Sequence, residues 1–412
     1  MNRRKLFAGV AAMALLLAAC GGAIAPPEEV PSSGGTGETS TTTEAPSTET
    51  TVATAAQGVL PEGPSALANM NDDAFPPALI DTNEIISGGP PPDGIPPIDD
   101  PVFISVADNL DLLDPAEAVV ALDIGGDARA YPVRAMIWHE IVNDTVGGVP
   151  VSVTYCPLCN SAVSYRREIR GVETTFGTSG RLFASALVMY DRATESLWTH
   201  FDGRAVVGIL AGEQLESISS PLMAWGDFRS AYPTGQVLDW TQTGFRRSYG
   251  VNPYTGYDNP DTDPFLFRGV LDDRAVAKQR VVGVEVDDVA VAFSLDLLAV
   301  GDANALNETV GDQPIVILWK SGQASALDRA SVGEGVDVGT AGVFDPMVDG
   351  TVLVFSAEDS SFVDETTGST WNLAGEAIEG PLTGTRLERL DHLDTFWFAW
   401  STYKPGTALV GP

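Results

Sequence analysis

The sequence predicts a mainly β protein with some α-helix (α+β), built from two tandem, pseudo-symmetric copies of one β-rich domain, each closed by a C-terminal helix. Runs of alternating apolar and polar residues, separated by glycine and aspartate turns, indicate strands joined as hairpins. Residues 118–245 can be laid over residues 280–412 with the same short motifs in the same order. Near the end of each copy an aromatic-rich run stops at a proline, which is typical of a helix.

The first residues are typical of an exported, lipid-modified protein. Residues 3–5 are all Arg or Lys, and residues 7–19 form an apolar stretch too short to span a membrane comfortably. The stretch leads to Cys20 in a pattern that resembles a bacterial lipobox. We therefore expect residues 1–20 to be a lipoprotein signal peptide and lipid on Cys20 to hold the protein at the extracytoplasmic face of the cell membrane. The alternative is an ordinary secreted protein cleaved near the same place.

Two segments connect this signal to the first copy. Residues 21–74 are rich in Ser, Thr, Glu, Pro and Gly and contain no aromatic residue. Such a segment cannot bury enough apolar surface to fold, so we expect a disordered tether. Prolines continue through residues 75–117, but Ile, Val and Phe side chains now intervene. This pattern indicates an extended arm that packs on the domain.

The internal repeat is clearest in the second part of each copy. Seven residues between 203 and 216 recur with the same identity 172 positions later. Helices are then predicted over residues 221–232 and residues 393–404, each ending at a proline. Residues 246–279 lie between the copies and are expected to form a linker.

The two copies differ where chemistry is expected. Lys320 and Gln323 stand in the second copy where the first has Cys156 and Cys159, and no histidine stands at the place of His200. A residue present in both copies is expected to serve the shared fold, whereas a residue special to one copy is a candidate for function. We therefore expect one site in the first copy and a degenerate second copy.

The best indication of chemistry is the pair Cys156 and Cys159, which with Cys20 are the only cysteines. In a metal knuckle, two thiolates separated by two residues face one ion. The residue after the second cysteine often needs φ > 0, which Asn160 tolerates better than most residues.

Two thiolates leave a metal ion short of ligands. We expect His139, together with His200, to complete the site. Sulfur and imidazole ligands suit zinc or copper. The protein would then act as a metal carrier or contain an enzyme centre.

The same cysteine pair suits two other functions. In a thiol-disulfide oxidoreductase the first cysteine attacks as a thiolate and the second resolves. However, polar and apolar residues alternate over residues 161–167, as in a strand. These residues therefore do not begin the long helix that follows the cysteine pair in a thioredoxin-like fold. In a non-catalytic cell-surface scaffold the pair would be a structural disulfide. The sequence leaves these functions open, and with them the question of catalysis.

Other residues are expected to surround the ligands. Glu140 follows His139 and is expected to orient it by a hydrogen bond. A glycine-bounded loop at residues 176–180 is expected to line a pocket. The surrounding residues are predicted to be Trp138, Glu140, Tyr155, Ser179 and Arg192.

Charge narrows the range of partners. The formal net charge is -33, and the chain contains only four lysines. Like charge repels, so nucleic acid and anionic lipid headgroups are not expected as partners. The acidic residues are spread along the chain and indicate a strongly hydrated surface. Attachment to the membrane is expected only through Cys20, and protein partners are not predicted.

Several motifs together resemble one bacterial protein family. They are residues 93–96, 130–132, 138–144, 153–159, 176–177, 179–180 and 190–192. They are similar to the family known as domain of unknown function 3179, and the resemblance covers most of residues 85–412. It implies that the Trp-His-Glu and Cys-Pro-Leu-Cys segments are the family's hallmark, and it brings no established reaction. A glycine usually follows the second cysteine in that family, so Asn160 is a mild departure that keeps the turn.

Overall fold

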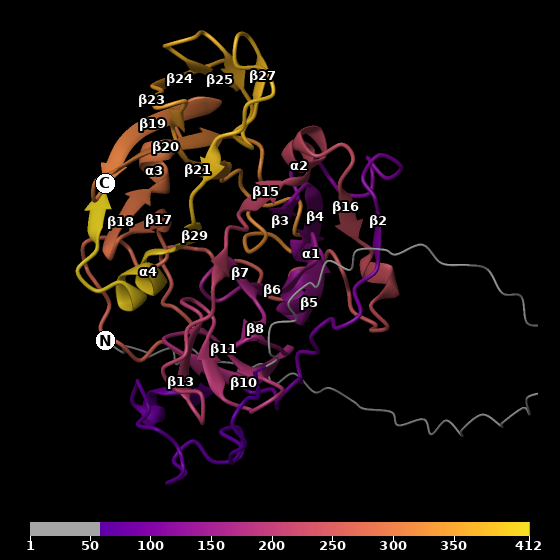
Figure 1. Cartoon of the computed structure of the whole chain (residues 1–412), viewed down its shortest axis with the longest axis vertical. Coiled ribbons are helices and arrows are strands. Elements are labelled where there is room, and N and C mark those ends of the chain that lie inside the picture. Colours follow the sequence, from indigo (N-terminus) through magenta and orange to yellow (C-terminus); the bar gives the residue numbers. More distant parts are fainter. Residues whose placement is uncertain (1–57, 412) are drawn as a thin grey trace, which may run out of the picture. The chain divides into compact units, whose positions relative to one another are not determined.

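The part of the chain that the structure describes, residues 58–411, is mainly β. Its computed structural model contains thirty strands, four α-helices and two 3₁₀-helices (Figure 1). The predicted class, mainly β with some helix, is therefore confirmed. The predicted signal peptide, Cys20 and most of the predicted tether lie outside the described residues. Within residues 58–411 no helix combines the length and the apolar character needed to cross a membrane.

Three sheets make up most of the first half, in the strand orders β15-β3-β4-β16-β2, β14-β7-β6-β5 and β1-β10-β11-β12-β13. The first sheet contains β2 (Phe103–Ser105), β3 (Ala118–Ile124), β4 (Asp127–Pro132), β15 (Leu222–Ala224) and β16 (Gln236–Leu238). The second contains β5 (Ile141–Val146), β6 (Val149–Cys156), β7 (Ser161–Arg166) and β14 (Ser217–Ile218). The third contains β1 (Ile86–Ser87), β10 (Phe176–Phe183), β11 (Ala186–Asp191), β12 (Leu197–Thr199) and β13 (Arg204–Val207), and β8 (Glu168–Ile169) pairs with β9 (Val172–Glu173).

Three sheets in the second half have the strand orders β29-β17-β18-β30, β19-β20-β21-β28 and β24-β25-β26-β27. The first contains β17 (Arg280–Val286), β18 (Val289–Ser294), β29 (His392–Phe396) and β30 (Ala408–Val410). The second contains β19 (Ala303–Val310), β20 (Gln313–Lys320), β21 (Thr340–Asp345) and β28 (Glu388–Arg389). The third contains β24 (Phe355–Glu358), β25 (Ser361–Asp364), β26 (Thr370–Trp371) and β27 (Ala377–Glu379), and β22 (Met347–Val348) pairs with β23 (Thr351–Val352).

The helices are short. They are α1 (Val133–His139), α2 (Trp225–Ala231), α3 (Leu295–Leu298) and α4 (Trp397–Tyr403), with the 3₁₀-helices Thr82–Glu84 and Trp240–Gln242. In each half a strand pairs antiparallel with one edge of the central hairpin, α2 or α4 follows, and the next strand pairs parallel with the other edge. Each of these helices therefore carries the chain from one edge of its hairpin to the other.

The two central hairpins have the turns that the sequence predicts. Strands β3 and β4 are joined by Gly125 and Gly126, at φ 62° and 89°, and β17 and β18 by Asp287 and Asp288, at φ 47° and 66°. Positive φ at both central residues is characteristic of the type I′ turn, whose twist matches that of the flanking strands. Glycine adopts this conformation freely, and aspartate tolerates it better than most residues.

The predicted helix starts are wrong in both halves. Leu222–Ala224 is strand β15, so α2 begins at Trp225 and not near residue 221. His392–Phe396 is strand β29, so α4 begins at Trp397. In each case the residues before the helix pair with a buried hairpin strand, and this pairing outweighs the local helix signal.

The packed part of the chain starts earlier than residue 75. Ala66 is fully buried and packs in a cluster with Val188, Leu197 and Val207 of the third sheet. Residues 58–74 were predicted to belong to the disordered tether, and the structure shows that they pack on the first half. The apolar residues of this stretch pack against the third sheet, and their local composition does not predict this contact.

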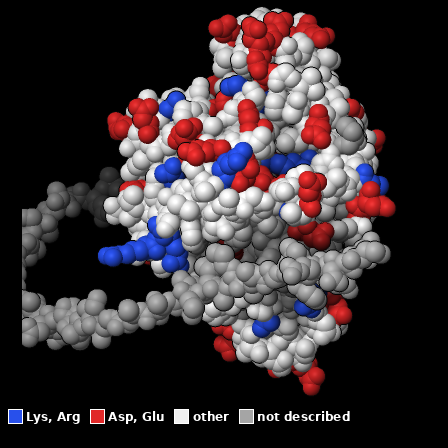
Figure 2. Space-filling model, turned by 180° about the vertical axis from the view of Figure 1, so that it is seen from behind, with Lys and Arg blue, Asp and Glu red and all other residues white. Residues whose placement is uncertain are grey.

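One buried cluster connects the two halves. It contains Cys156 and Cys159 of the first half together with Val281, Phe396 and Trp400 of the second. Residues 58–411 accordingly fall within one compact unit. The surface is strongly acidic, and Figure 2 shows Asp and Glu spread over the visible face with fewer Lys and Arg among them.

The contact between α4 and β17 provides a test of this packing. A Cβ atom added at Gly283 would lie 2.2 Å from Cε3 of Trp400, whose ring is 2% exposed. The ring cannot easily retreat, because its Nε1 also donates a hydrogen bond to Thr407 Oγ1 at 2.9 Å. We expect Gly283→Ala to lower the free energy of unfolding by about 1–3 kcal/mol, measured by urea denaturation with tryptophan fluorescence.

The matched control is Gly333→Ala. The nearest atom to an added Cβ at Gly333 is 3.5 Å away, which is ordinary van der Waals contact. This variant should unfold at nearly the same urea concentration as the wild-type protein. Equal stability of the two variants would contradict the tight contact between β17 and α4.

Candidate metal centre

The two cysteines lie in the turn that joins β6 to β7. Cys156 ends β6 and pairs with Ser161, the first residue of β7. Asn160 has φ 50°, so the predicted left-handed residue after the second cysteine is confirmed. This conformation lets the chain reverse within four residues while both thiols lie on the same side of the turn.

His200 is the third member of the site. The Sγ atoms of Cys156 and Cys159 and a ring nitrogen of His200 all lie within 4.8 Å of one another. The three residues are 0–1% exposed. His200 follows β12, and both of its backbone groups are held: its N–H donates to Leu187 O at 3.1 Å, and its carbonyl accepts from Tyr165 Oη at 2.8 Å. The imidazole is therefore positioned by the sheet.

The imidazole of His200 has no hydrogen-bond partner within residues 58–411. Both ring nitrogens are buried and unpaired, which is unusual because an unsatisfied buried polar group costs about 1–3 kcal/mol. Burial lowers the pKa of His200 to about 3, so the ring is neutral at physiological pH. A neutral imidazole beside two sulfurs is the form that coordinates a metal ion.

The two thiols are inequivalent. Burial acts to raise the pKa of Cys156, but hydrogen bonds from the Cys159 thiol and from the backbone of Leu187, Cys159 and Leu158 outweigh it and lower the pKa. Burial raises the pKa of Cys159 well above its usual value, and the neighbouring Cys156 thiolate raises it further. Cys159 Sγ also lies 3.0 Å from Ser161 Oγ. Cys156 is therefore the more acidic thiol of the pair.

The structure does not bring His139 into this group. Its Nδ1 lies 2.7 Å from Pro96 O, and its Nε2 lies 2.8 Å from Tyr249 Oη. Since a carbonyl only accepts, Nδ1 carries the proton and Nε2 accepts from the tyrosine. Both nitrogens are thus occupied, and His139 joins α1 to the arm and to residues 246–279. Of the two histidines that the sequence predicts as ligands, the structure places His200 beside the cysteines and His139 elsewhere.

Glu140 and Tyr155 lie next to the cysteine turn. Glu140 is 6% exposed and ends α1 with φ 59°. Burial raises the pKa of its carboxyl well above the usual value, and the proximity of Cys156 raises it further. Tyr155 Oη donates to Asn160 Oδ1 at 3.2 Å and so supports the turn. The carbonyl of Glu140 accepts from the Tyr155 N–H at 2.8 Å, which connects the end of α1 to β6, and no hydrogen bond of its carboxyl to His139 is found among the described residues.

The other predicted surrounding residues have separate roles. Trp138 Nε1 is buried without a partner in the described chain. Ser179 Oγ donates to Val188 O at 2.5 Å within the third sheet. Arg192 forms ion pairs with Asp99 at 2.8 Å and Asp93 at 3.2 Å. Ser179 therefore stabilises the sheet, and Arg192 fastens the arm to it.

The second half closes one side of the turn. The carbonyl of Cys159 accepts hydrogen bonds from Thr395 Oγ1 at 2.7 Å and from the Phe396 N–H at 3.1 Å. Asn160 Nδ2 donates to Asp394 Oδ1 at 3.3 Å, and Asp394 forms a partly buried ion pair with Arg280 at 2.6 Å. Nothing in the local pattern of these residues marks them as neighbours of the cysteines, so the sequence does not predict their place beside the turn.

Residues 246–279 cover another side of the cysteine turn, although the sequence predicts only a linker there. Tyr257 Oη donates to Leu158 O at 3.0 Å and accepts from the Phe265 N–H at 3.1 Å. Lys278 is 2% exposed and donates to Tyr257 O at 2.5 Å. The density of tyrosines in this segment was the available signal. The segment of residues 246–279 covers the turn between the cysteines and helps to exclude water.

Burial of His200 predicts a pH dependence of the metal-free protein. In the unfolded chain His200 takes up a proton near pH 6.5, whereas in the folded chain it does so only near pH 3. The unfolded state therefore binds more protons between these values, and stability is lost as the pH falls. We expect the loss from His200 to be about 1.4 kcal/mol per pH unit.

The measurement is chemical denaturation of chelator-treated wild-type protein and of His200→Gln between pH 7 and pH 4. The side chain of Gln does not titrate, so the variant should lose less stability over this range. Other groups, including His139 and His392, contribute equally to both curves. Parallel curves would contradict the depressed pKa of His200.

The comparisons with known proteins add a family assignment. A family model described as a protein of unknown function (DUF3179) matches residues 92–407. Neither the curated proteins nor the solved structures gave a match. The matched region contains the cysteine turn, His200, the covering residues 246–279 and most of the second half. The chain therefore belongs to the DUF3179 family.

Proposed function

We propose that this protein binds one transition-metal ion through the Sγ atoms of Cys156 and Cys159 and a ring nitrogen of His200. The observation that carries the proposal is the buried imidazole of His200, whose two nitrogens lack partners in the described chain although two sulfurs lie within 4.8 Å. Polar groups this deeply buried are almost always paired. A metal ion would supply the missing interaction.

The ligand set indicates the kind of site. Two thiolates and one imidazole suit zinc or copper. Structural zinc sites are closed by four protein ligands, whereas catalytic sites have three and leave a position open. Among the described His, Cys, Asp and Glu residues, only Cys156, Cys159 and His200 form such a group. Three protein ligands favour a carrier or an enzyme centre over a purely structural ion.

A thiol-disulfide oxidoreductase is the second candidate. The lowered pKa of Cys156 beside the raised pKa of Cys159 is the asymmetry that a nucleophilic and a resolving cysteine require. Against this function, both thiols are at most 1% exposed and are covered by residues 246–279 and by the second half. Reactive cysteines are normally partly exposed. A protein substrate would have to displace this cover.

We also infer that the two halves derive from one duplicated domain. The sheet orders correspond, and one buried network recurs: Asp191 accepts from Trp198 Nε1 at 3.0 Å, and Asp364 accepts from Trp371 Nε1 at 3.0 Å. The second half has no cysteine pair and serves as a wall of the site in the first half.

Metal analysis tests the proposal. Mature full-length protein, purified without chelator from metal-replete cells, should contain about one zinc or copper ion per chain by plasma mass spectrometry. Cys156→Ser/Cys159→Ser and His200→Asn should each lose the metal by about tenfold or more, because each removes a ligand. His139→Asn is the matched control and should retain it, since the imidazole of His139 is engaged elsewhere.

Two outcomes would count against the proposal. Loss of metal in His139→Asn but not in His200→Asn would show that the ligand set is wrong. Absence of metal from the wild-type protein, with a disulfide between Cys156 and Cys159 in its intact mass, would favour the oxidoreductase. Thermal unfolding of every variant shows whether metal loss reflects misfolding.

Membrane attachment is a separate proposal. We propose that the mature chain is anchored at the extracytoplasmic face of the cell membrane through lipid on Cys20, on the basis of the charged and apolar residues before it. The wild-type protein should partition into detergent, and its N-terminal peptide should carry a diacylglyceryl mass on Cys20. Cys20→Ala should abolish both. An unmodified N-terminus after Cys20 in the wild-type protein would contradict the proposal.

A further inference from the structure

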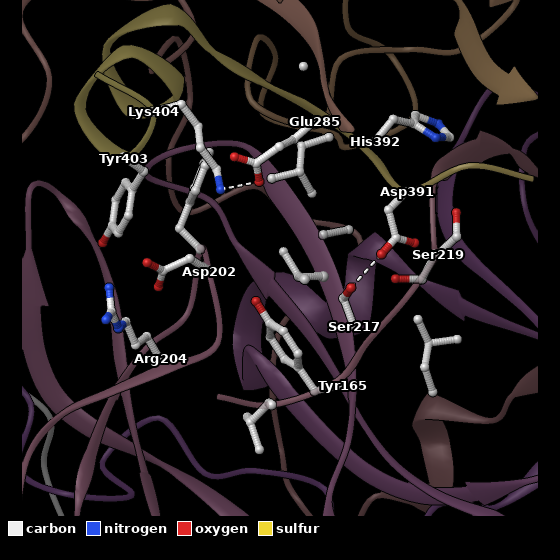
Figure 3. A pocket seen from close by; sticks show the side chains of 18 of the residues that line it. Tyr165, Asp202, Arg204, Ser217, Ser219, Glu285, Asp391, His392, Tyr403 and Lys404 are labelled. Carbon is white, nitrogen blue, oxygen red and sulfur yellow. Dashed lines mark hydrogen bonds and ion pairs between the residues drawn. The ribbon is translucent and has the colours of Figure 1, made fainter. Parts of the chain in front are cut away.

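A cavity of about 550 Å³ lies between the two halves (Figure 3). The first half contributes Tyr165, Phe201 and Asp202 to its lining, and the second contributes Glu285, Tyr403 and Lys404. Figure 3 shows Asp202, Tyr403 and Lys404 around one part of the cavity and Tyr165 facing it from β7. Its size is typical of small-ligand sites.

One wall of this cavity adjoins the candidate metal centre. Phe201 is the residue after His200, and Tyr165 Oη donates to the carbonyl of His200 at 2.8 Å. The ring of Tyr403 stacks on Phe201, with centroids 4.6 Å apart and an interplanar angle of 17°. Phe201 and Tyr403 both line the cavity. Aromatic side chains thus form the wall on this side.

The lining of the cavity favours cations. Four carboxylates line it, against two cationic side chains, and Lys404 is already paired with Glu285. Asp202 accepts a hydrogen bond from Thr199 Oγ1, which orients its carboxylate beside the wall. The net charge of -33 adds a long-range attraction for positive ions.

A buried metal site requires a route for its ion. Cys156, Cys159 and His200 are at most 1% exposed, so side chains must move before an ion can enter. Tyr403 is the last residue of α4, and its hydroxyl makes one long hydrogen bond, to Phe183 O at 3.3 Å. The ring also contacts Phe183 edge-on, with centroids 5.9 Å apart, so it gives up its contacts with Phe201 and Phe183 when it swings aside.

We propose that this cavity is the entrance through which a hydrated divalent cation reaches Cys156, Cys159 and His200. Asp202 is the carboxylate that first holds the ion, and the stacked rings of Phe201 and Tyr403 are the gate. The inference rests on the proposed metal site and adds the route by which that site is filled. Asp202 and the gate affect the rates of metal binding and release far more than the affinity, because neither is a ligand.

Stopped-flow uptake of Co²⁺ by reduced, metal-free, full-length protein tests the route, with thiolate-to-cobalt absorbance as the readout. At low ionic strength Asp202→Asn should slow association by about threefold or more, and the effect should shrink in high salt. Its equilibrium affinity should stay within about twofold of wild type. Tyr403→Ala should speed association and dissociation together. Asp312→Asn removes the same charge from an exposed position between β19 and β20 and should behave like the wild-type protein.

The outcomes separate this inference from the proposed function. If the wild-type protein does not bind Co²⁺, the metal site itself fails. If Co²⁺ binds through Cys156, Cys159 and His200 but Asp202→Asn associates at the wild-type rate, the entrance is elsewhere and the inference is overturned. An equal slowing in Asp312→Asn would also overturn it, because the effect would then be one of total charge. Asp202→Asn decides the question even if Tyr403→Ala does not fold.

Discussion

The hydrogen bonds on the carbonyl of Cys159 are the interaction on which the site depends. Thr395 and Phe396 of the second half donate to this carbonyl, so the turn that carries the thiols is also the joint between the halves. The partly buried ion pair of Asp394 and Arg280 is connected to the same turn through Asn160. The cysteine geometry is therefore coupled to the packing of the whole described chain.

Burial explains both the neutral state of the His200 imidazole and the free-energy cost of its unpaired nitrogens. Excluding water keeps the imidazole of His200 neutral and leaves its nitrogens without partners. The metal ion proposed for this site would offset this cost, which would link metal binding to folding stability. The same burial keeps the thiols away from protein substrates, and the proposed metal ion would need a route through the surrounding side chains. The stacked rings of Phe201 and Tyr403 line the cavity between the halves. Phe201 directly follows His200 in the chain.

Local signals predicted the parts of the fold that depend on few residues. The hairpin turns at residues 125–126 and 287–288 and the left-handed conformation of Asn160 follow from residue type alone. The helix starts were misplaced, because the residues before α2 and α4 pair with hairpin strands that are distant in sequence. Residues 246–279 resemble a linker in sequence because they form no helix or named strand, although Tyr257 binds the cysteine turn through Leu158.

The sequence by itself determined the mainly β class, the cysteine pair and the half of the chain in which the site lies. Only the tertiary structure decided the third member of the site. His139 is closer to the cysteines in sequence and stands beside Trp138 and Glu140, yet its nitrogens bind Pro96 and Tyr249. His200 lies on another sheet and reaches the sulfurs because the backbone contacts with Leu187 and Tyr165 hold it there. Proximity between side chains on different sheets depends on strand register and packing, which spacing along the chain does not encode.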